Sequence, residues 1–276
     1  PSARVPMAVA PPDGLVEQDV ASAAEFAELH KRFKRRGLHA EDVVCGSFAH
    51  LMELLFADSF EHECGHHRSP LAFRGQADAD WGLLCTGQRT GPSGAWPNEK
   101  FRSMEGGLVR RFVNEAHGEL PAGSHLFDWL ALGQHHGLPT RLLDWTKSPL
   151  VALHFATENI EEHGDKDGCI WAVNPWLSLM ESEKYRTWRR KWEGKRNGKH
   201  WGWFTTRELD DFVSFCCGSA VEQQPSIIDR LPIPFVFLNS ATVNERIERQ
   251  MGVFAVVNLR QPMDRALRQG RMTTDG

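Results

Sequence analysis

The chain has 276 residues, with 32 Lys and Arg against 36 Asp and Glu, which gives a formal net charge of −4. Hydrophobic residues make up 41% and charged residues 25%, which excludes a disordered chain and a protein that coats nucleic acid through net charge alone. No stretch approaches the ~18 apolar residues of a membrane span, and the N-terminal residues show no signal-peptide pattern. The six cysteines are scattered, so we expect reduced thiols, no disulfide framework and a cytoplasmic protein that does not contact a membrane.

Helices dominate the elements predicted in the first half of the chain. Apolar residues recur at helical spacing in four segments, namely residues 20–36, 47–60, 101–117 and 124–136. Gly37 and Gly137 follow two of these segments and predict helix ends. Between the helices, residues 71–75 predict a short strand that enters a turn, and the Gly- and Pro-rich residues 86–98 predict a loop.

Strands and helices alternate in the second half. Residues 140–145 are predicted to be extended, with Ser148 as the N-cap and Pro149 as the first residue of a helix over 149–159. Three further segments read as strands, namely residues 169–174, 234–240 and 252–258. Thr242 and Glu245 fit a capping box that opens another short helix.

This order of elements predicts an α+β fold, a single domain with small mixed or antiparallel sheets flanked by helices. We expect residues 1–19 to be disordered or derived from a tag and residues 20–69 to form a helical N-terminal elaboration. The domain itself is expected over residues 70–260, with a C-terminal tail over 261–276.

Two segments concentrate polar residues in apolar surroundings. One is Phe73-Arg74-Gly75-Gln76, followed by Trp81, and the other is QHHGLPTRLLDWT over residues 134–146. A buried Arg or Asp costs several kcal/mol unless it is paired, so such runs indicate a hydrogen-bonded network. In one interpretation Arg141 and Asp144 pair structurally and Trp145 fills the core. In the other the segments line a ligand cleft in which Arg binds an anion, Trp stacks on a planar group and Thr orients the ligand.

Four stretches carry a resemblance to a known family. They are FRGQADADW, MEGGLVRRF, LALGQHHGLPTRLLDWTKSPLVALHFA and ERIERQMGVF. Over residues ~70–258 the chain resembles the FRG domain family of bacterial and phage proteins, which is named after its Phe-Arg-Gly motif. The family is defined by sequence more than by activity, so the resemblance says more about the fold than about the reaction.

The order of the motifs is also similar to that of NAD-dependent ADP-ribosyltransferases, which implies an ADP-ribosyltransferase-like fold. In those enzymes an Arg-Gly strand grips NAD, a second strand with Ser or Thr supports the cleft, and a late Glu or Gln contacts the ribose. By position, Arg74 and Gly75 match the first element, and residues 144–146 with Ala152 and Phe155 match the second. For the third, no Glu-x-Glu strand is present, and Glu245, Glu248 and Gln250 precede the strand at 252.

Cleavage of the nicotinamide–ribose bond develops positive charge on the ribose, which a carboxylate or polarised amide stabilises. The candidates for this role are Glu105, Asp144 and Glu248, with Gln250 as a neutral alternative; the capping box already accounts for Glu245. Glu105 occupies a position where the family motif has Glu, but an exposed helix charge explains it equally well. The residues expected to catalyse the reaction are Arg74, Glu105, Asp144 and Gln250.

NAD as a substrate needs a cation for its pyrophosphate and an aromatic wall for its nicotinamide. Arg74 or Arg141 suits the first task through its planar guanidinium, and Trp145 or Trp81 suits the second. The residues expected to contact NAD are Arg74, Gly75, Gln76, Trp81, His135, Thr140, Arg141, Trp145 and Thr146.

The histidines predict no metal site. His62, Cys64, His66 and His67 are zinc-ligand types, but their spacing fits no closed site and favours a solvated loop. His135 and the adjacent His136 suit either a general base or a structural role.

A basic, Trp-rich segment spans residues 184–203, with eight Lys and Arg, one acid and four Trp. Basic residues interleaved with aromatics are typical of single-stranded nucleic acid binding. The residues expected to bind are Trp188, Arg189, Arg190, Lys191, Trp192, Lys195 and Arg196. The alternative is an amphipathic helix that buries Trp188 and Trp192 and solvates its basic face.

Three functions are therefore compatible with the sequence. The first is an NAD-dependent ADP-ribosyltransferase that modifies nucleic acid or protein as a toxin or phage-defence effector. The second is a non-catalytic module that binds a nucleotide or nucleic acid in the same cleft. The third, a metal-dependent nuclease using Asp144, His135 and His136, lacks a paired-carboxylate motif.

Overall fold

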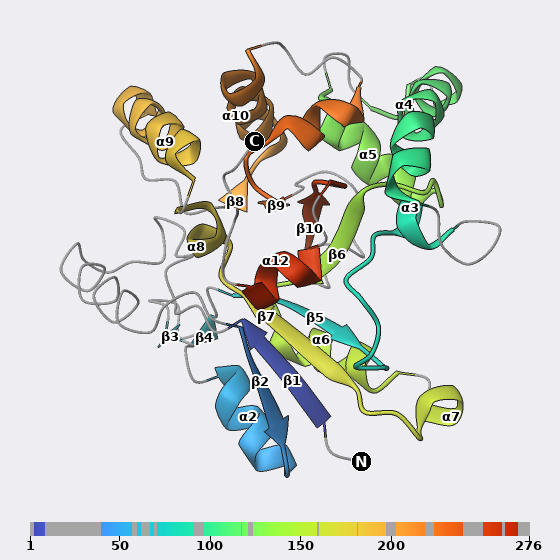
Figure 1. Cartoon of the computed structure of the whole chain (residues 1–276), viewed down its shortest axis with the longest axis vertical. Helices are drawn as coiled ribbons and strands as arrows, with labels where there is room; N and C mark the ends of the chain where they lie inside the picture. Colours follow the sequence, from blue (N-terminus) through green and yellow to red (C-terminus); the bar gives the residue numbers. More distant parts are fainter. Residues whose placement is uncertain are drawn as a thin grey trace.

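A computed structural model shows an α+β protein built around one large sheet (Figure 1). The residues that the structure describes are 3–8, 40–56, 60–61, 67–68, 71–90, 97–116, 118–120, 124–158, 160–180, 182–196, 203–218, 224–239, 251–260 and 263–269.

Eight strands form a mixed sheet in the order β2-β1-β7-β5-β6-β10-β9-β8. Their bounds are β1 Ala3–Ala8, β2 Ala40–Cys45, β5 Ala72–Gln76, β6 Leu142–Thr146, β7 Cys169–Val173, β8 Trp203–Phe204, β9 Phe235–Leu238 and β10 Gly252–Val257. Neighbouring strands are antiparallel except for two parallel pairs, β1 with β7 and β8 with β9. A separate two-stranded ribbon pairs β3 (Phe60–Glu61) with β4 (His67–Arg68). The α+β class is confirmed, but most of the strands belong to one sheet and not to several small ones.

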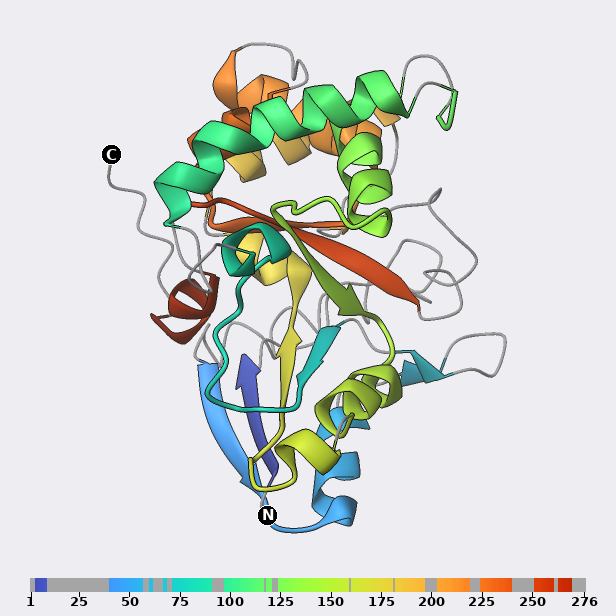
Figure 2. The ribbon, with the colours of Figure 1, turned by 90° about the vertical axis from the view of Figure 1, so that its right-hand side faces the viewer.

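The helices lie before, between and after these strands. Their bounds are α2 Phe48–Phe56, α3 Thr86–Arg89, α4 Asn98–Glu115, α5 Leu126–His135, α6 Pro149–Ala156, α7 Ile160–His163, α8 Pro175–Met180, α9 Glu183–Arg196, α10 Thr206–Cys217, the 3-10 helix η2 Pro225–Arg230, and α12 Met263–Gln269. Figure 2 shows the long α4 and the shorter α5 at one end of the molecule, and α2, α6 and α7 at the other. No helix within the described ranges is both long and apolar enough to cross a membrane.

The register of the sheet explains which side chains share a face. Phe73 of β5 lies directly opposite Thr146 of β6, so both side chains point to the same face. On β6 this face also carries Leu142, because alternate residues of a strand point the same way. Leu142 belongs to the hydrophobic cluster beneath α5, α10 and η2, whereas Phe73 packs in a second cluster with Ala152 of α6. One face is therefore covered by two separate groups of helices.

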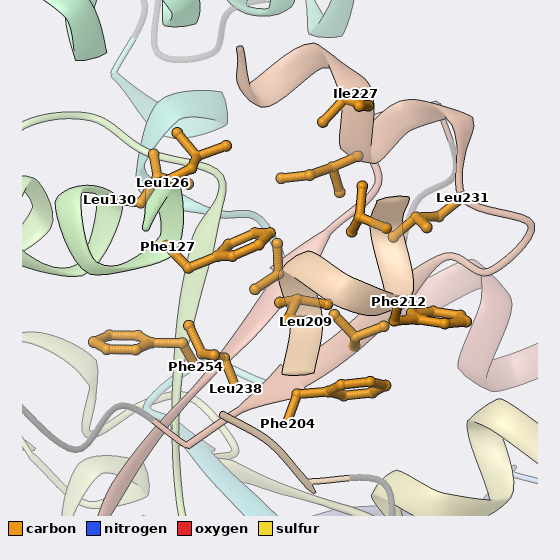
Figure 3. Close-up of a cluster of buried hydrophobic side chains, with 14 of the residues drawn as sticks. Leu126, Phe127, Leu130, Phe204, Leu209, Phe212, Ile227, Leu231, Leu238 and Phe254 are labelled. Carbon is orange, nitrogen blue, oxygen red and sulfur yellow. The ribbon is translucent and has the colours of Figure 1, made fainter. Parts of the chain in front are cut away.

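Figure 3 shows the larger of these two clusters, in which Phe127 of α5 lies near Leu209 of α10, and Phe212 of α10 stacks on Phe204 of β8. The opposite face of the sheet carries a third cluster that includes Leu143, Trp145 and Phe237. Alternation along β6 thus places consecutive side chains in different layers of the core.

Local sequence signals explain the two turns that flank β6. Gly137 has φ +83 after α5, and the N–H groups of Gly137 and Leu138 donate to the carbonyls of Gln134 and Gly133, at 3.0 and 2.8 Å. This is a Schellman motif, in which glycine supplies the left-handed residue. At α6, the Ser148 hydroxyl accepts the N–H of Val151 at 3.4 Å. The predicted helix end and the predicted N-cap are both confirmed.

Several boundaries differ from the prediction. Residues 3–8 form strand β1 and not an unstructured N-terminus, and residues 40–45 form β2 within the expected helical elaboration. The predicted helix over 47–60 ends at Phe56, and the predicted loop over 86–98 contains α3 and the first residue of α4. The helix expected over 20–36 and the Thr242–Glu245 capping box lie outside the described residues.

Candidate functional site

A pocket of about 500 Å³ opens on the sheet face where the two groups of helices separate. Its floor comes from β5, β6 and β10, and its sides come from α5 and α6. The lining residues are Phe73, Arg74, Gly75, Thr86, Ala131, Gln134, His135, Asp144, Trp145, Thr146, Val151, Phe155, Gly252, Val253 and Phe254. This volume lies in the range of small-molecule sites.

The pocket forms where two neighbouring strands part. The register between β5 and β6 consists of the single pair Phe73 and Thr146. In contrast, β5 pairs with β7 along residues 72–76, and β6 pairs with β10 along residues 142–146. Across the opening, Nη1 of Arg74 donates to the backbone carbonyl of Asp144 at 2.6 Å. The Arg74 side chain therefore takes the place of a missing backbone hydrogen bond between the strands.

Arg74 retains unused hydrogen-bonding capacity. Its Nε atom is buried and has no partner among the described residues, and the same holds for Nε1 of Trp145. Burial lowers the pKa of Arg74 to about 10, and the nearby charge of Asp144 offsets only part of that effect. A buried donor without an acceptor is costly, so the Nε–H group of the pocket-lining Arg74 is left for an acceptor atom of a bound ligand, whereas the Trp145 ring packs in the cluster on the opposite face of the sheet.

The Asp144 carboxylate is held by a chain of hydrogen bonds. Nε2 of Gln134 donates to Oδ1 of Asp144 at 2.8 Å, and Oγ1 of Thr140 donates to Oε1 of Gln134 at 2.5 Å. The Thr140 hydroxyl in turn accepts the N–H of Leu142 at 3.2 Å. Asp144 is the exposed residue of the otherwise buried β6, so the strand presents one fixed carboxylate to the pocket.

Gly75 is required by the packing of α6. A Cβ on Gly75 would lie 1.8 Å from the carbonyl oxygen of Ala152 and 2.7 Å from the backbone nitrogen of Ala156. Only glycine lets α6 approach β5 so closely, and this approach forms one side of the pocket. Gly75 thus lines the predicted cleft, but its contacts give it a structural reason to be glycine.

A second group of charges lies buried away from the pocket. The Arg141 guanidinium donates to Glu105 from Nη2 at 2.5 Å and to Asp229 from Nη1 at 3.0 Å, and all three side chains have at most 1% exposure. Arg102 also pairs with Asp229 at 2.7 Å. Burial alone would lower the pKa of Arg141, but Glu105 and then Asp229 more than offset it and raise this pKa.

This buried network corrects two predictions. Arg141 was expected to bind NAD and Glu105 to stabilise the ribose charge, but neither lines the pocket, because each is the other's ion-pair partner. The alternative pairing of Arg141 with Asp144 is also wrong: Asp144 contacts Gln134. Asp229 was not anticipated, since no pattern in its segment marks an acid that pairs with a residue 88 positions earlier.

Two other predicted NAD contacts lie outside the pocket lining. Gln76 is buried, where its Oε1 accepts Nε1 of Trp171 at 2.7 Å and its Nε2 donates to the carbonyl of Gly82 at 3.3 Å. Trp81 is 45% exposed and is not among the lining residues. Gln76 therefore fastens the turn after β5 to the sheet, because its amide joins β7 to residue 82.

The remaining predicted contacts fall in or beside the pocket. His135, Trp145 and Thr146 line it, and Trp145 is buried with its ring edge-to-face to Phe237, at 5.4 Å between centroids. Thr140 reaches the site through Gln134. Gln250 lies outside the described residues, although the pocket-lining Gly252 follows it closely in the chain.

Gln134 and Phe155 also line the pocket, although neither was among the predicted catalytic or NAD-contacting residues. Gln134 opens the motif that ends at Thr146, and Phe155 lies in the following helical segment. The motif therefore marked Gln134 as a candidate residue. The contact between Gln134 and Asp144 could not be predicted, because it depends on how α5 packs over β6.

The basic segment is largely a structural helix. Trp188 is 2% exposed in the core and donates from Nε1 to Asp211 at 3.1 Å, so the expectation that it stacks on a base is wrong. Trp192 packs against the same cluster, and Arg189 pairs with Glu193 at 2.8 Å. The alternative of an amphipathic helix is confirmed for Trp188.

Exposed cations remain on this helix. Arg190 is exposed, and Nζ of the exposed Lys191 lies 4.9 Å from the ring centroid of Phe215. The side chains of Lys195 and Arg196 lie outside the description. The helix therefore presents a basic surface, but Trp188 is buried and cannot stack on a nucleic acid base.

Among the described residues, no group of three His, Cys, Asp or Glu side chains is placed to hold a metal ion. The segment with His62 and Cys64 lies outside the residues that the structure describes.

A family model described as the FRG domain matches residues 69–165. This match supports the resemblance to that family and covers the segment that contains Arg74, Gln134 and Asp144. No curated protein and no solved structure matches the chain.

Proposed function

We propose that the pocket between α5 and α6 binds NAD and cleaves its nicotinamide–ribose bond, with transfer of the ADP-ribosyl group to an acceptor. The observation that carries this proposal is the placement of two charged groups on one wall of the pocket. The Asp144 carboxylate is fixed by Gln134, and the Arg74 guanidinium is fixed on the carbonyl of that same Asp144.

The proposed reaction breaks the bond between C1′ of the ribose and the nicotinamide nitrogen, and nicotinamide leaves as a neutral molecule. The positive charge that develops on the ribose is stabilised by the Asp144 carboxylate. The nucleophile of the acceptor then bonds to C1′ and loses its proton. With Glu105 committed to Arg141, Asp144 is the carboxylate of the described pocket lining that remains for this role.

The other lining groups suit the rest of the ligand. The free Nε of the pocket-lining Arg74 donates a hydrogen bond to a phosphate or amide oxygen. The ring of Phe155 offers apolar surface for the nicotinamide. The pocket thus combines a cation, an anion and aromatic surface within about 500 Å³.

The direct test is incubation of the purified chain with NAD labelled in its nicotinamide. We expect nicotinamide release that falls by roughly 10²–10³-fold in Asp144→Asn, because one charge-stabilising group is lost. Asp165→Asn, at an exposed position outside the pocket, is the matched control and retains the activity. Absence of nicotinamide release, together with no rise in Tm on addition of NAD, would overturn the proposal.

One observation favours a non-catalytic nucleotide-binding module as the second candidate. Asp144 is a single carboxylate among the described lining residues, whereas the ADP-ribosyltransferase pattern adds a late Glu or Gln. A chain that gains Tm with NAD or a nucleotide, loses this gain in Arg74→Met and releases no nicotinamide would support this candidate.

A single-stranded nucleic acid is the acceptor that the surface favours, in keeping with an effector of the toxin or phage-defence kind. Exposed cations gather on α9 and on the start of α10, namely Arg186, Arg190, Lys191 and Arg207. Phosphate contacts of this kind weaken with salt. The test measures oligonucleotide binding over a salt series, in which Arg190→Glu with Lys191→Glu weakens binding and Lys166→Glu, an exposed site elsewhere, does not.

A further inference from the structure

We infer that Gln134 and Thr140 are positioning residues that hold the Asp144 carboxylate in one orientation through a directional chain of hydrogen bonds. The catalytic consequence rests on the proposed function of Asp144. The chain itself is a property of the described structure and is tested separately.

The direction of the chain follows from its two ends, because the N–H of Leu142 can only donate and the Asp144 carboxylate accepts. The backbone N–H of Leu142 has only a proton to give, so the Thr140 hydroxyl accepts it at 3.2 Å. The hydroxyl proton is then left for Oε1 of Gln134, at 2.5 Å. With its oxygen engaged, the Gln134 amide must present its NH₂ group to Oδ1 of Asp144, at 2.8 Å.

This direction removes an ambiguity that a side-chain amide otherwise has. An amide can turn over and exchange its oxygen and nitrogen, and only its partners decide which way it points. Turned over, Gln134 would place a carbonyl oxygen against the Asp144 carboxylate, and both are acceptors. The hydroxyl proton of Thr140 and the acceptor-only carboxylate of Asp144 together therefore select one orientation of the Gln134 amide.

The chain is anchored in rigid surroundings. Thr140 is fully buried, and its carbonyl accepts the N–H of Gly87 at 2.9 Å. The next residue, Arg141, is held by Glu105 and Asp229 in the buried network. Gln134 lies in the last turn of α5, directly before the Schellman motif. Thr140 and Gln134 are thus both held in place by the backbone around them.

The chain uses one oxygen of the carboxylate and leaves the other. Oδ1 of Asp144 accepts from Gln134, whereas Oδ2 makes no hydrogen bond within the part of the chain that the structure describes. A carboxylate with one oxygen held and one oxygen open suits a group that must face a developing positive charge.

The test replaces the Thr140 hydroxyl without a change of shape. Thr140→Val removes the hydroxyl, and Thr140→Ser keeps it as the matched control. We expect kcat for nicotinamide release to fall by about 10- to 100-fold in Thr140→Val with KM for NAD unchanged, because misorientation of a catalytic group costs this much. Thr140→Ser restores the activity, whereas a purely structural role for Thr140 would lower the folded fraction and leave kcat per folded molecule unchanged.

A spectroscopic readout tests the chain without activity. The side-chain amide of Gln134, assigned by its loss in Gln134→Met, is expected to show slowly exchanging protons in the ¹⁵N-correlated NMR spectrum. These protons should exchange faster in Thr140→Val and in Asp144→Asn, but not in Thr140→Ser. An amide that is unaffected by both changes would overturn the inference.

Two further outcomes separate the inference from the proposed function. If Asp144→Asn leaves nicotinamide release intact but alters the Gln134 amide signal, the catalytic role of Asp144 fails and the hydrogen-bond chain stands. If Thr140→Val does not fold, Gln134→Met carries the kinetic test, since Gln134 is only half-buried and Met has a similar shape. Unchanged kcat in Gln134→Met overturns the positioning role.

Discussion

Arg74 and Arg141 come from the two motif segments of the chain, and the structure puts them to opposite uses. Arg141 is fully buried with Glu105 and Asp229 as ion-pair partners, and its pKa is raised. Arg74 reaches one backbone carbonyl, keeps a buried Nε without a partner in the described structure, and has its pKa lowered to about 10 by burial.

The difference shows how to separate a structural charge from a functional one. A buried charge whose partners satisfy it contributes to the fold and has nothing left for a ligand. A charge held in place but incompletely paired costs stability, and such groups gather at binding sites. The motif run from Gln134 to Thr146 contains both kinds within a few residues, with Arg141 in the network and Asp144 in the pocket.

The largest effect is expected on the buried network. Arg141→Met leaves the Glu105 and Asp229 carboxylates buried without their main partner, so the free energy of unfolding should fall by about 3–5 kcal/mol. Urea unfolding followed by circular dichroism measures this loss. Arg111→Met, which removes an exposed pair with Glu115, is the control and should leave the unfolding curve unchanged. Equal stability of both variants would show that the network does not support the fold.

The second effect concerns Arg74. Its substitution should not lower the free energy of unfolding, but it should weaken NAD binding. The folded-state pKa of about 10 lies below the ordinary value of 12.5, so the charge carries a cost at neutral pH that disappears as the pH rises through this interval. Arg74→Met should therefore keep or slightly raise the unfolding free energy, while NAD affinity falls roughly 10- to 100-fold with the loss of a charged hydrogen bond.

Thermal unfolding with and without NAD, together with a binding titration, checks both parts of this expectation. A large loss of stability in Arg74→Met would place Arg74 with Arg141 as a structural charge and break the comparison.

The smallest expected effect is on the reactivity of a buried thiol next to the Arg141 network. Cys85 is fully buried near Glu105 and Arg141, and burial raises its pKa to about 12. Because the thiolate is the reactive form, iodoacetamide should leave Cys85 unmodified in the native chain. Peptide mass spectrometry should detect faster labelling in Arg141→Met, where the network opens more often. Labelling of Cys85 in the native chain as fast as in urea would contradict this picture of a closed network.

Local patterns predicted the parts of the fold that depend on neighbours in the chain. Ser148 and Pro149 begin α6, Gly137 ends α5, and the apolar run over 252–257 forms β10 as expected. The same local reasoning could not separate one sheet from several, because strand order is set by pairings between distant segments. The β1–β7 pair, for example, joins residues 3–8 to residues 169–173.

The candidate site was predicted in part for the same reason. Arg74, Asp144, Trp145 and Thr146 were expected together from their motifs, and they do line one pocket. Glu105 and Arg141 were expected there too, but each is paired with the other across 36 positions of sequence. Trp188 resembled a stacking residue because a basic helix with aromatics also describes a helix that packs its aromatics inward.

The sequence by itself determined which polar residues need an explanation, because they are too costly to bury unless they are paired or bind a ligand. Only the tertiary structure decided which of the two applies to each residue. The deciding factor is the distance to a partner far along the chain, because Arg141 finds two carboxylates and Arg74 finds one carbonyl. The first arginine therefore belongs to the core and the second to the pocket.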